Sequence, residues 1–98
     1  MELSSKQRKY LRSKAHHLKP VVTIGKAEFS QSVIDNVDSC LKSHELIKIK
    51  FSHHKDEKIE IIDKINSAIN SQVVGSIGNI MIVFRQNLDL DKRIYKID

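Results

Sequence analysis

Residues 20–26 read PVVTIGK, and this stretch sets the arrangement of the whole chain. Pro20 disfavours helix at the residue before it, and the β-branched run from Val21 to Ile24 is typical of a short strand. Gly25 ends that strand, because glycine permits backbone angles that a side chain would forbid. Residues 25–28 are therefore predicted to form a tight loop that leads from a strand into a helix.

Apolar residues at helical spacing lie on both sides of this strand. Ser4 or Ser5 can cap a first helix over residues 5–16, and Ser30 can cap a second helix that runs to about residue 43. A strand is predicted at residues 46–51, where apolar residues alternate with lysine. These elements make a β-α-β unit that is preceded in the sequence by one helix.

The second half of the chain predicts one more helix and a hairpin. Residues 55–70 return to helical spacing, and the short turn Gly78-Asn79 joins predicted strands at residues 72–77 and 80–85. The order α-β-α-β-α-β-β indicates an α/β fold of the α+β two-layer kind with a mixed four-stranded sheet. Residues 1–98 are expected to form a single domain, in which residues 86–98 are a polar C-terminal tail.

The positive charge of the chain is concentrated at one end. Residues 1–26 carry seven basic residues against one acidic residue, an excess of +6, whereas residues 27–98 carry ten basic and eleven acidic residues. Charge gathered in this way attracts polyanions, so nucleic acid and anionic membrane are the candidate partners. The first helix lacks the wide, bulky apolar face that inserts into a membrane, which disfavours the membrane.

The basic helix and the glycine loop are the candidate binding site. Arg8 and Arg12 are one helical turn apart and can follow a phosphate backbone together. The loop leads into a helix N-terminus, where free backbone N–H groups and the helix dipole favour anions, and Lys26 adds a charge. Both features also have an ordinary structural explanation, since most charge runs are solvated surface and most loop glycines serve only the turn.

Other kinds of chemistry are not indicated. The histidine pairs at residues 16–17 and 53–54 diverge, the single Cys40 cannot complete a zinc site or an internal disulfide, and no catalytic constellation stands out. We therefore expect no metal, no cofactor, no small-molecule substrate and no enzymatic activity. The chain has no apolar run of about 18 residues and no signal peptide, so we expect a cytoplasmic protein that does not bind membranes. We also expect the protein to be a monomer.

Several strings, in order, resemble one known family. They are LSSKQRKYLR at residues 3–12, AH at 15–16, LKPVV at 18–22, IGK at 24–26, HELIKIK at 44–50, IGN at 77–79, then Ile82 and Phe84-Arg85. Together they resemble the CRM-domain family, named after chloroplast RNA splicing and ribosome maturation, and within it the bacterial stand-alone type called YhbY. The resemblance extends over nearly the whole chain.

The resemblance implies a fold similar to the C-terminal domain of translation initiation factor three, and RNA binding without catalysis. Bacterial members of the family act on precursors of the large ribosomal subunit, so the implied partners are ribosomal RNA and those precursor particles. RNA contact is assigned to a Gly-x-x-Gly-type loop and to basic side chains near it. The candidate RNA-binding residues are Lys6, Arg8, Lys9, Arg12, Lys14, His16, Lys19, Gly25, Lys26, Ala27, Glu28 and Arg85.

One departure from the family pattern bears on RNA binding. Glu28 stands where the second glycine of the loop is usual, and its carboxylate would repel phosphate. We therefore expect the basic helix to contribute more to binding than the loop does. Two other functions stay open: a protein-interaction module that docks this helix on an acidic partner, and a nuclease or other nucleic-acid enzyme.

Overall fold

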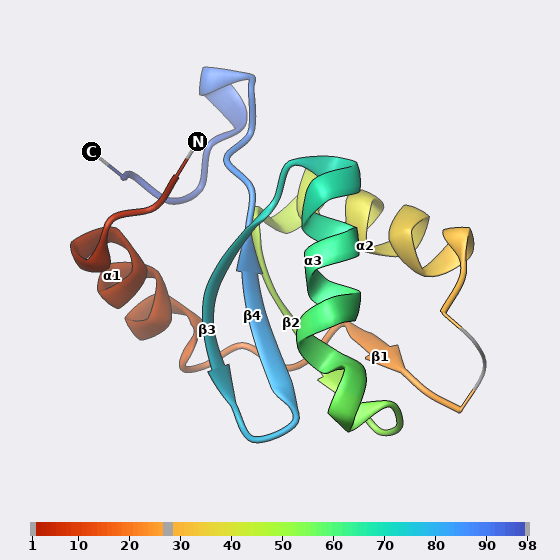
Figure 1. Cartoon of the computed structure of the whole chain (residues 1–98). Coiled ribbons are helices and arrows are strands. Elements are labelled where there is room, and N and C mark those ends of the chain that lie inside the picture. The colour runs from red at the N-terminus through yellow and green to blue at the C-terminus, as the bar shows by residue number, and fades with distance from the viewer. Residues whose placement is uncertain (1, 27–28, 98) are drawn as a thin grey trace.

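A computed structural model describes residues 2–26 and 29–97 (Figure 1). The element order matches the predicted order and boundaries shift by only a few residues. The third helix begins later than expected, because residues 55–57 form a separate 3-10 turn. The elements are α1 (Ser5–Ala15), β1 (Val22–Ile24), α2 (Gln31–His44), β2 (Leu46–Phe51), η1 (Lys55–Glu57), α3 (Lys58–Ile69), β3 (Gln72–Ile77), β4 (Ile80–Phe84) and η2 (Leu90–Lys92).

The four strands form one mixed sheet in the order β1-β2-β4-β3. β1 runs parallel to β2, with Val22 opposite Ile49, while β4 is antiparallel to both of its neighbours. The hairpin between β3 and β4 turns at Gly78, whose φ of 57° is the left-handed conformation that glycine adopts without strain. The predicted α/β fold with a mixed four-stranded sheet is confirmed.

The helices lie on both faces of the sheet (Figure 1). Helices α2 and α3 cover one face, where alternate residues of β2, including Ile47 and Ile49, join a large aliphatic core. On the other face, Leu46 and Phe84 pack with Leu11 and Ala15 of α1 in a second core. The first helix therefore adds a partial third layer to the two that the sequence predicts.

The C-terminal segment, which the sequence predicts to be a polar tail, is hydrogen-bonded to the rest of the domain. Glu45 ends α2 with a φ of 60° and is completely buried. Its carboxylate accepts hydrogen bonds from three backbone N–H groups of the segment, those of Asn87 (2.6 Å), Ile94 (2.6 Å) and Tyr95 (3.1 Å). The Tyr95 ring meets Phe84 edge to face, and burial, followed by the charge of Glu45, raises the pKa of Tyr95. Residues 86–97 are thus fastened against the second core, beside α1.

Candidate nucleic-acid interface

Helix α1 is fixed at its start and along one face, and it presents cations on the other. Ser4 and Gln7 form a capping box, in which each side chain accepts a hydrogen bond from the backbone N–H of the other residue. Leu11 and Ala15 are completely buried. The exposed basic side chains of this helix are Lys6, Lys9, Arg12 and Lys14.

The two arginines of α1 are held in place by the protein itself. Arg8 donates through Nη1 to the carbonyl of Leu3 (2.7 Å) and through Nη2 to the hydroxyl of Ser5 (3.2 Å). Arg12 donates through Nη1 to the carbonyl of Val74 (3.2 Å) and crosses over β3. A guanidinium has five N–H donors, so each arginine keeps donors for a ligand while its plane is fixed.

The crossing of Arg12 over β3 requires a glycine at position 75. A Cβ added to Gly75 would lie 2.8 Å from Cδ of Arg12, which is closer than non-bonded carbons approach. At Gly25, by contrast, an added Cβ would meet only the Ser52 hydroxyl, at 3.8 Å. Gly25 has no positive φ either, so the expectation that its backbone angles require glycine is wrong.

These two glycines give a matched pair of substitutions. Gly75→Ala is expected to displace Arg12 and to lower the free energy of unfolding by about 1 kcal/mol, the lower end of overpacking costs. Gly25→Ala is expected to change stability by less than half of that amount. Urea unfolding of both variants measures the difference, and equal losses would show that the Arg12 crossing has no energetic importance.

The sheet face beneath α1 carries two further lysines that the sequence reasoning did not select. Lys48 donates through Nζ to the carbonyl of Leu18 (3.0 Å) and so holds the connection between α1 and β1 against β2. Lys50 lies two residues further along β2, on the same face, and is exposed. The alternating pattern in residues 46–51 places both lysines on one face of the strand. Only the fold shows that α1 packs on that same face.

The remaining predicted residues around α1 and the loop are solvent-accessible. His16 and His17 are exposed, with ring centroids 5.1 Å apart in an edge-to-face arrangement. Lys19 and Lys26 are exposed, and Gly25 is half-buried. The roles predicted for Ala27 and Glu28 lie outside the described residues.

Arg85 lies on the other face of the sheet, where it is hydrogen-bonded to α2 and to the end of α3. Its Nη1 forms an ion pair with Oδ1 of Asp38 in α2 (2.6 Å) and also donates to the carbonyl of Ile69 (3.1 Å). Its Nη2 donates to the carbonyl of Asp38 (3.0 Å). Arg85 therefore joins α2 to the end of α3, apart from the cations of α1.

This ion pair predicts a pH-dependent contribution to stability. The hydrogen bond from Arg85 holds the pKa of Asp38 below its usual value of 3.8. The contribution is thus complete above that value and disappears as the pH falls through the lower pKa of the folded protein. Asp38→Asn is expected to cost about 1 kcal/mol at neutral pH, since the pair is partly exposed.

Urea unfolding at pH 7 and at pH 3 tests this prediction. The difference between wild type and Asp38→Asn should shrink at pH 3. Asp35→Asn, in an exposed residue of the same helix, is the control and should change stability little at either pH. A difference between wild type and Asp38→Asn that is the same at both pH values would contradict the assignment.

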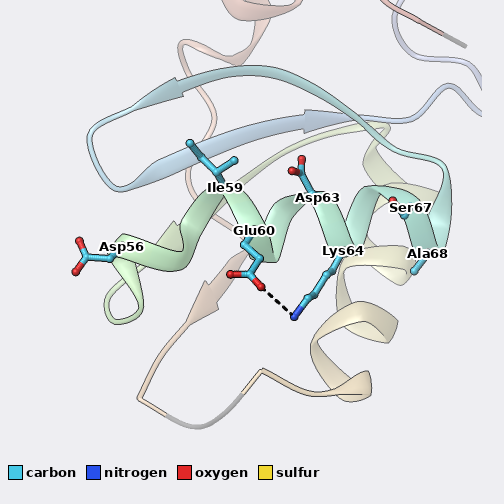
Figure 2. Close-up of a pocket in the computed structure, with 7 residues that line it drawn as sticks. All are labelled: Asp56, Ile59, Glu60, Asp63, Lys64, Ser67 and Ala68. Carbon is cyan, nitrogen blue, oxygen red and sulfur yellow. Dashed lines mark ion pairs between the residues drawn. The ribbon is translucent and has the colours of Figure 1, made fainter.

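A shallow hollow on the exposed side of α3 is an unsuitable place for a polyanion (Figure 2). Carboxylates dominate its charged groups, and Lys64 is paired with Glu60 (3.6 Å). All of its lining residues belong to η1 and α3, and none belongs to α1 (Figure 2). The residues that line it are Asp56, Ile59, Glu60, Asp63, Lys64, Ser67 and Ala68.

The described ranges, 2–26 and 29–97, contain neither a metal-binding cluster nor a membrane-spanning helix. No three side chains of His, Cys, Asp or Glu gather there in a way that could hold a metal ion. Within the same ranges, every helix is too short or too polar to cross a membrane.

Comparison with known sequences identifies the family. The sequence model of the CRS1/YhbY (CRM) domain matches residues 3–85. The chain belongs to this family. The match begins just before α1 and ends after β4, so the basic helix, the glycine loop and the whole sheet are parts of the CRM domain.

Relatives of this CRM domain are named as RNA-binding proteins. A probable RNA-binding protein of Methanocaldococcus jannaschii is 41% identical over 87 residues, which are 86% of this chain and 64% of the relative. A probable RNA-binding protein of Pseudomonas aeruginosa is 32% identical over 98 residues, 99% of this chain and 94% of the relative. The chain thus spans slightly less than two thirds of the first relative and almost all of the second.

A solved structure has the same architecture. The solution structure of a hypothetical protein from Staphylococcus aureus is 30% identical in sequence and superposes with a TM-score of 0.77. The similarity covers 96% of this chain and 99% of the other. The CRM fold described above, with α1 on one face of the sheet and α2 and α3 on the other, is therefore shared with an experimentally determined relative.

Proposed function

We propose that this CRM-domain protein binds ribosomal RNA in precursors of the large ribosomal subunit and assists their assembly. The observation that carries the proposal is α1, a capped helix whose apolar side is buried and whose other side presents Lys6, Lys9 and Lys14 to solvent. Lys50 adds a cation on the same face of the sheet. The names of the relatives support RNA as the polyanion, and the family resemblance supports the ribosomal precursor.

Binding in this scheme depends mainly on the phosphate backbone. Lysine ammonium groups neutralise phosphates and release counterions, which gives affinity with little dependence on base sequence. Arg8 and Arg12, fixed by their own backbone contacts, place planar donors at defined positions beside the lysines. Gly25 and Lys26 are a second contact, at the end of β1, for a neighbouring part of the same RNA.

Sedimentation of a cell extract tests the ribosomal part of the proposal. The protein should migrate with precursors of the large subunit in a gradient, and ribonuclease should release it. Migration only with free protein would contradict the assembly role. A particle-bound pool that survives both ribonuclease and excess competing RNA would instead favour the alternative, in which the basic helix docks on an acidic protein.

A further inference from the structure

The sheet face under α1 is only partly covered by other parts of the chain. Helix α1 and the C-terminal segment cover the end of this face near Leu46 and Phe84. At the opposite end, the strand register aligns one row of side chains across all four strands. That row consists of Thr23, Lys50, Ile80 and Ile77.

This row offers charge, a hydroxyl and aliphatic contact, but no aromatic ring. Thr23, Lys50 and Ile77 are exposed, and Ile80 is half-buried. A sheet that binds unpaired RNA typically stacks the bases on aromatic side chains, and each stacked base contributes about 1–3 kcal/mol. The free face of this sheet lacks that device.

The aromatic residues of the chain are all engaged elsewhere. The sequence has three phenylalanines, two tyrosines and no tryptophan. Phe51 and Phe84 are completely buried, and Phe29 packs against the core under α2 and α3. Tyr10 and Tyr95 pack against the second core, and the ammonium group of Lys14 lies 5.5 Å from the centre of the Tyr10 ring.

Guanidinium planes can also stack on bases, but those of α1 are restrained. Arg8 is bonded to Leu3 and Ser5, and Arg12 is bonded to Val74 and lies across Gly75. The exposed rings at the end of α1 belong to His16 and His17, which already pack edge to face on each other. The exposed lysines on this side, Lys6, Lys9, Lys14 and Lys50, bind phosphates as point charges.

From these observations we infer that the ligand of this surface is double-stranded RNA, held by its backbone across α1 and the free row of the sheet. Double-stranded RNA is recognised by shape and through phosphate and 2′-hydroxyl contacts, which lysine and threonine side chains can make. This inference rests on the proposed RNA-binding function and adds the class of RNA. It also assigns a contact to Lys50, on β2.

Binding to an RNA duplex, to each of its strands alone and to the DNA duplex of the same sequence tests the inference. At one salt concentration, the RNA duplex should bind at least about tenfold more tightly than either strand or the DNA, since an A-form backbone and its 2′-hydroxyls are what this surface fits. Lys50→Ala should weaken duplex binding about five- to eightfold at 0.1 M salt, whereas Lys64→Ala in the acidic hollow should not.

Each other outcome has a distinct meaning. Single strands that bind as tightly as the duplex would overturn the inference and leave the proposed RNA binding intact. If His16→Ala/His17→Ala then lost the binding of single strands, the unpaired bases would be assigned to stacking on the histidine rings. DNA that binds as tightly as the RNA duplex would also overturn it, because charge alone would then explain the affinity. If the protein bound none of these RNAs, the result would contradict the proposed RNA-binding function itself.

Discussion

Replacing Glu45 with alanine is expected to lower the free energy of unfolding by about 3 kcal/mol, because each of three N–H groups would lose its acceptor at a cost of about 1 kcal/mol or more. Glu45 is completely buried, and the backbone N–H groups of Asn87, Ile94 and Tyr95 converge on its carboxylate. The segment that carries these groups packs beside α1, so its release should also loosen that helix.

Glu45→Gln separates the hydrogen bonds from the rest of the side chain. The glutamine oxygen can still accept from Ile94 and Tyr95, which share one carboxylate oxygen, but its NH₂ group would face the N–H of Asn87. The expected loss is about 1–2 kcal/mol, the cost of one unsatisfied and partly buried donor. Glu60→Ala, on the exposed side of α3, should cost less than about 1 kcal/mol, as surface ion pairs do.

Urea unfolding gives these losses, and two further measurements locate them. Amide exchange at Ile94 and Tyr95 should accelerate in Glu45→Ala, and the pKa of Tyr95 should return toward its usual value of 10.0, because both burial and the Glu45 charge raise it. Unchanged stability with protected amides at both positions would show that Glu45 does not fasten the C-terminal segment.

Removal of two lysines from α1 should have the largest effect on binding. Lys6 and Lys9 are exposed and one turn apart on the capped helix. If each neutralises one phosphate, Lys6→Ala/Lys9→Ala should weaken RNA binding about 25- to 60-fold at 0.1 M salt, from a slope of about 0.7–0.9 per contact. The fold should survive, because neither side chain belongs to the second core.

The matched control removes the same charge from the opposite side. Lys42 and Lys64 lie on α2 and α3, each within 4 Å of a carboxylate of its own helix, at 3.4 Å and 3.6 Å. Lys42→Ala/Lys64→Ala lowers the net charge by the same two units and should weaken binding less than about threefold, by the loss of long-range attraction alone. Equal effects of the two double variants would show that net charge, and not α1, determines the affinity.

The regular elements were predictable because their signals are local. The β-branched run at residues 21–24, the Ser4 cap and the lysine alternation in residues 46–51 each depend on a few neighbouring residues, and the structure confirms the elements they predict. Ser30 stands at the N-cap position of α2, but its side chain makes no capping hydrogen bond, so that part of the prediction is wrong. The bend at Gly78 was predictable for the same reason, since a two-residue turn between two apolar runs specifies a hairpin.

What could not be predicted depends on partners distant in sequence. Glu45 resembles a surface residue at a helix end, and its role becomes visible only when residues 42 to 50 positions later approach it. Arg85 resembles a free cation until Asp38, 47 residues earlier, is placed beside it. The position of Lys50 beside α1 is not visible in the sequence, because the alternation does not tell which face of the sheet α1 covers.

The salt dependence of RNA binding tests the central role of α1 most directly. Affinity for a large-subunit ribosomal RNA fragment should fall linearly on a log–log plot against salt, and the slope should decrease by about 1.4–1.8 in Lys6→Ala/Lys9→Ala. The slope of Lys42→Ala/Lys64→Ala should equal that of wild type. A wild-type slope near zero, or the same decrease in both double variants, would contradict a phosphate-binding surface on α1.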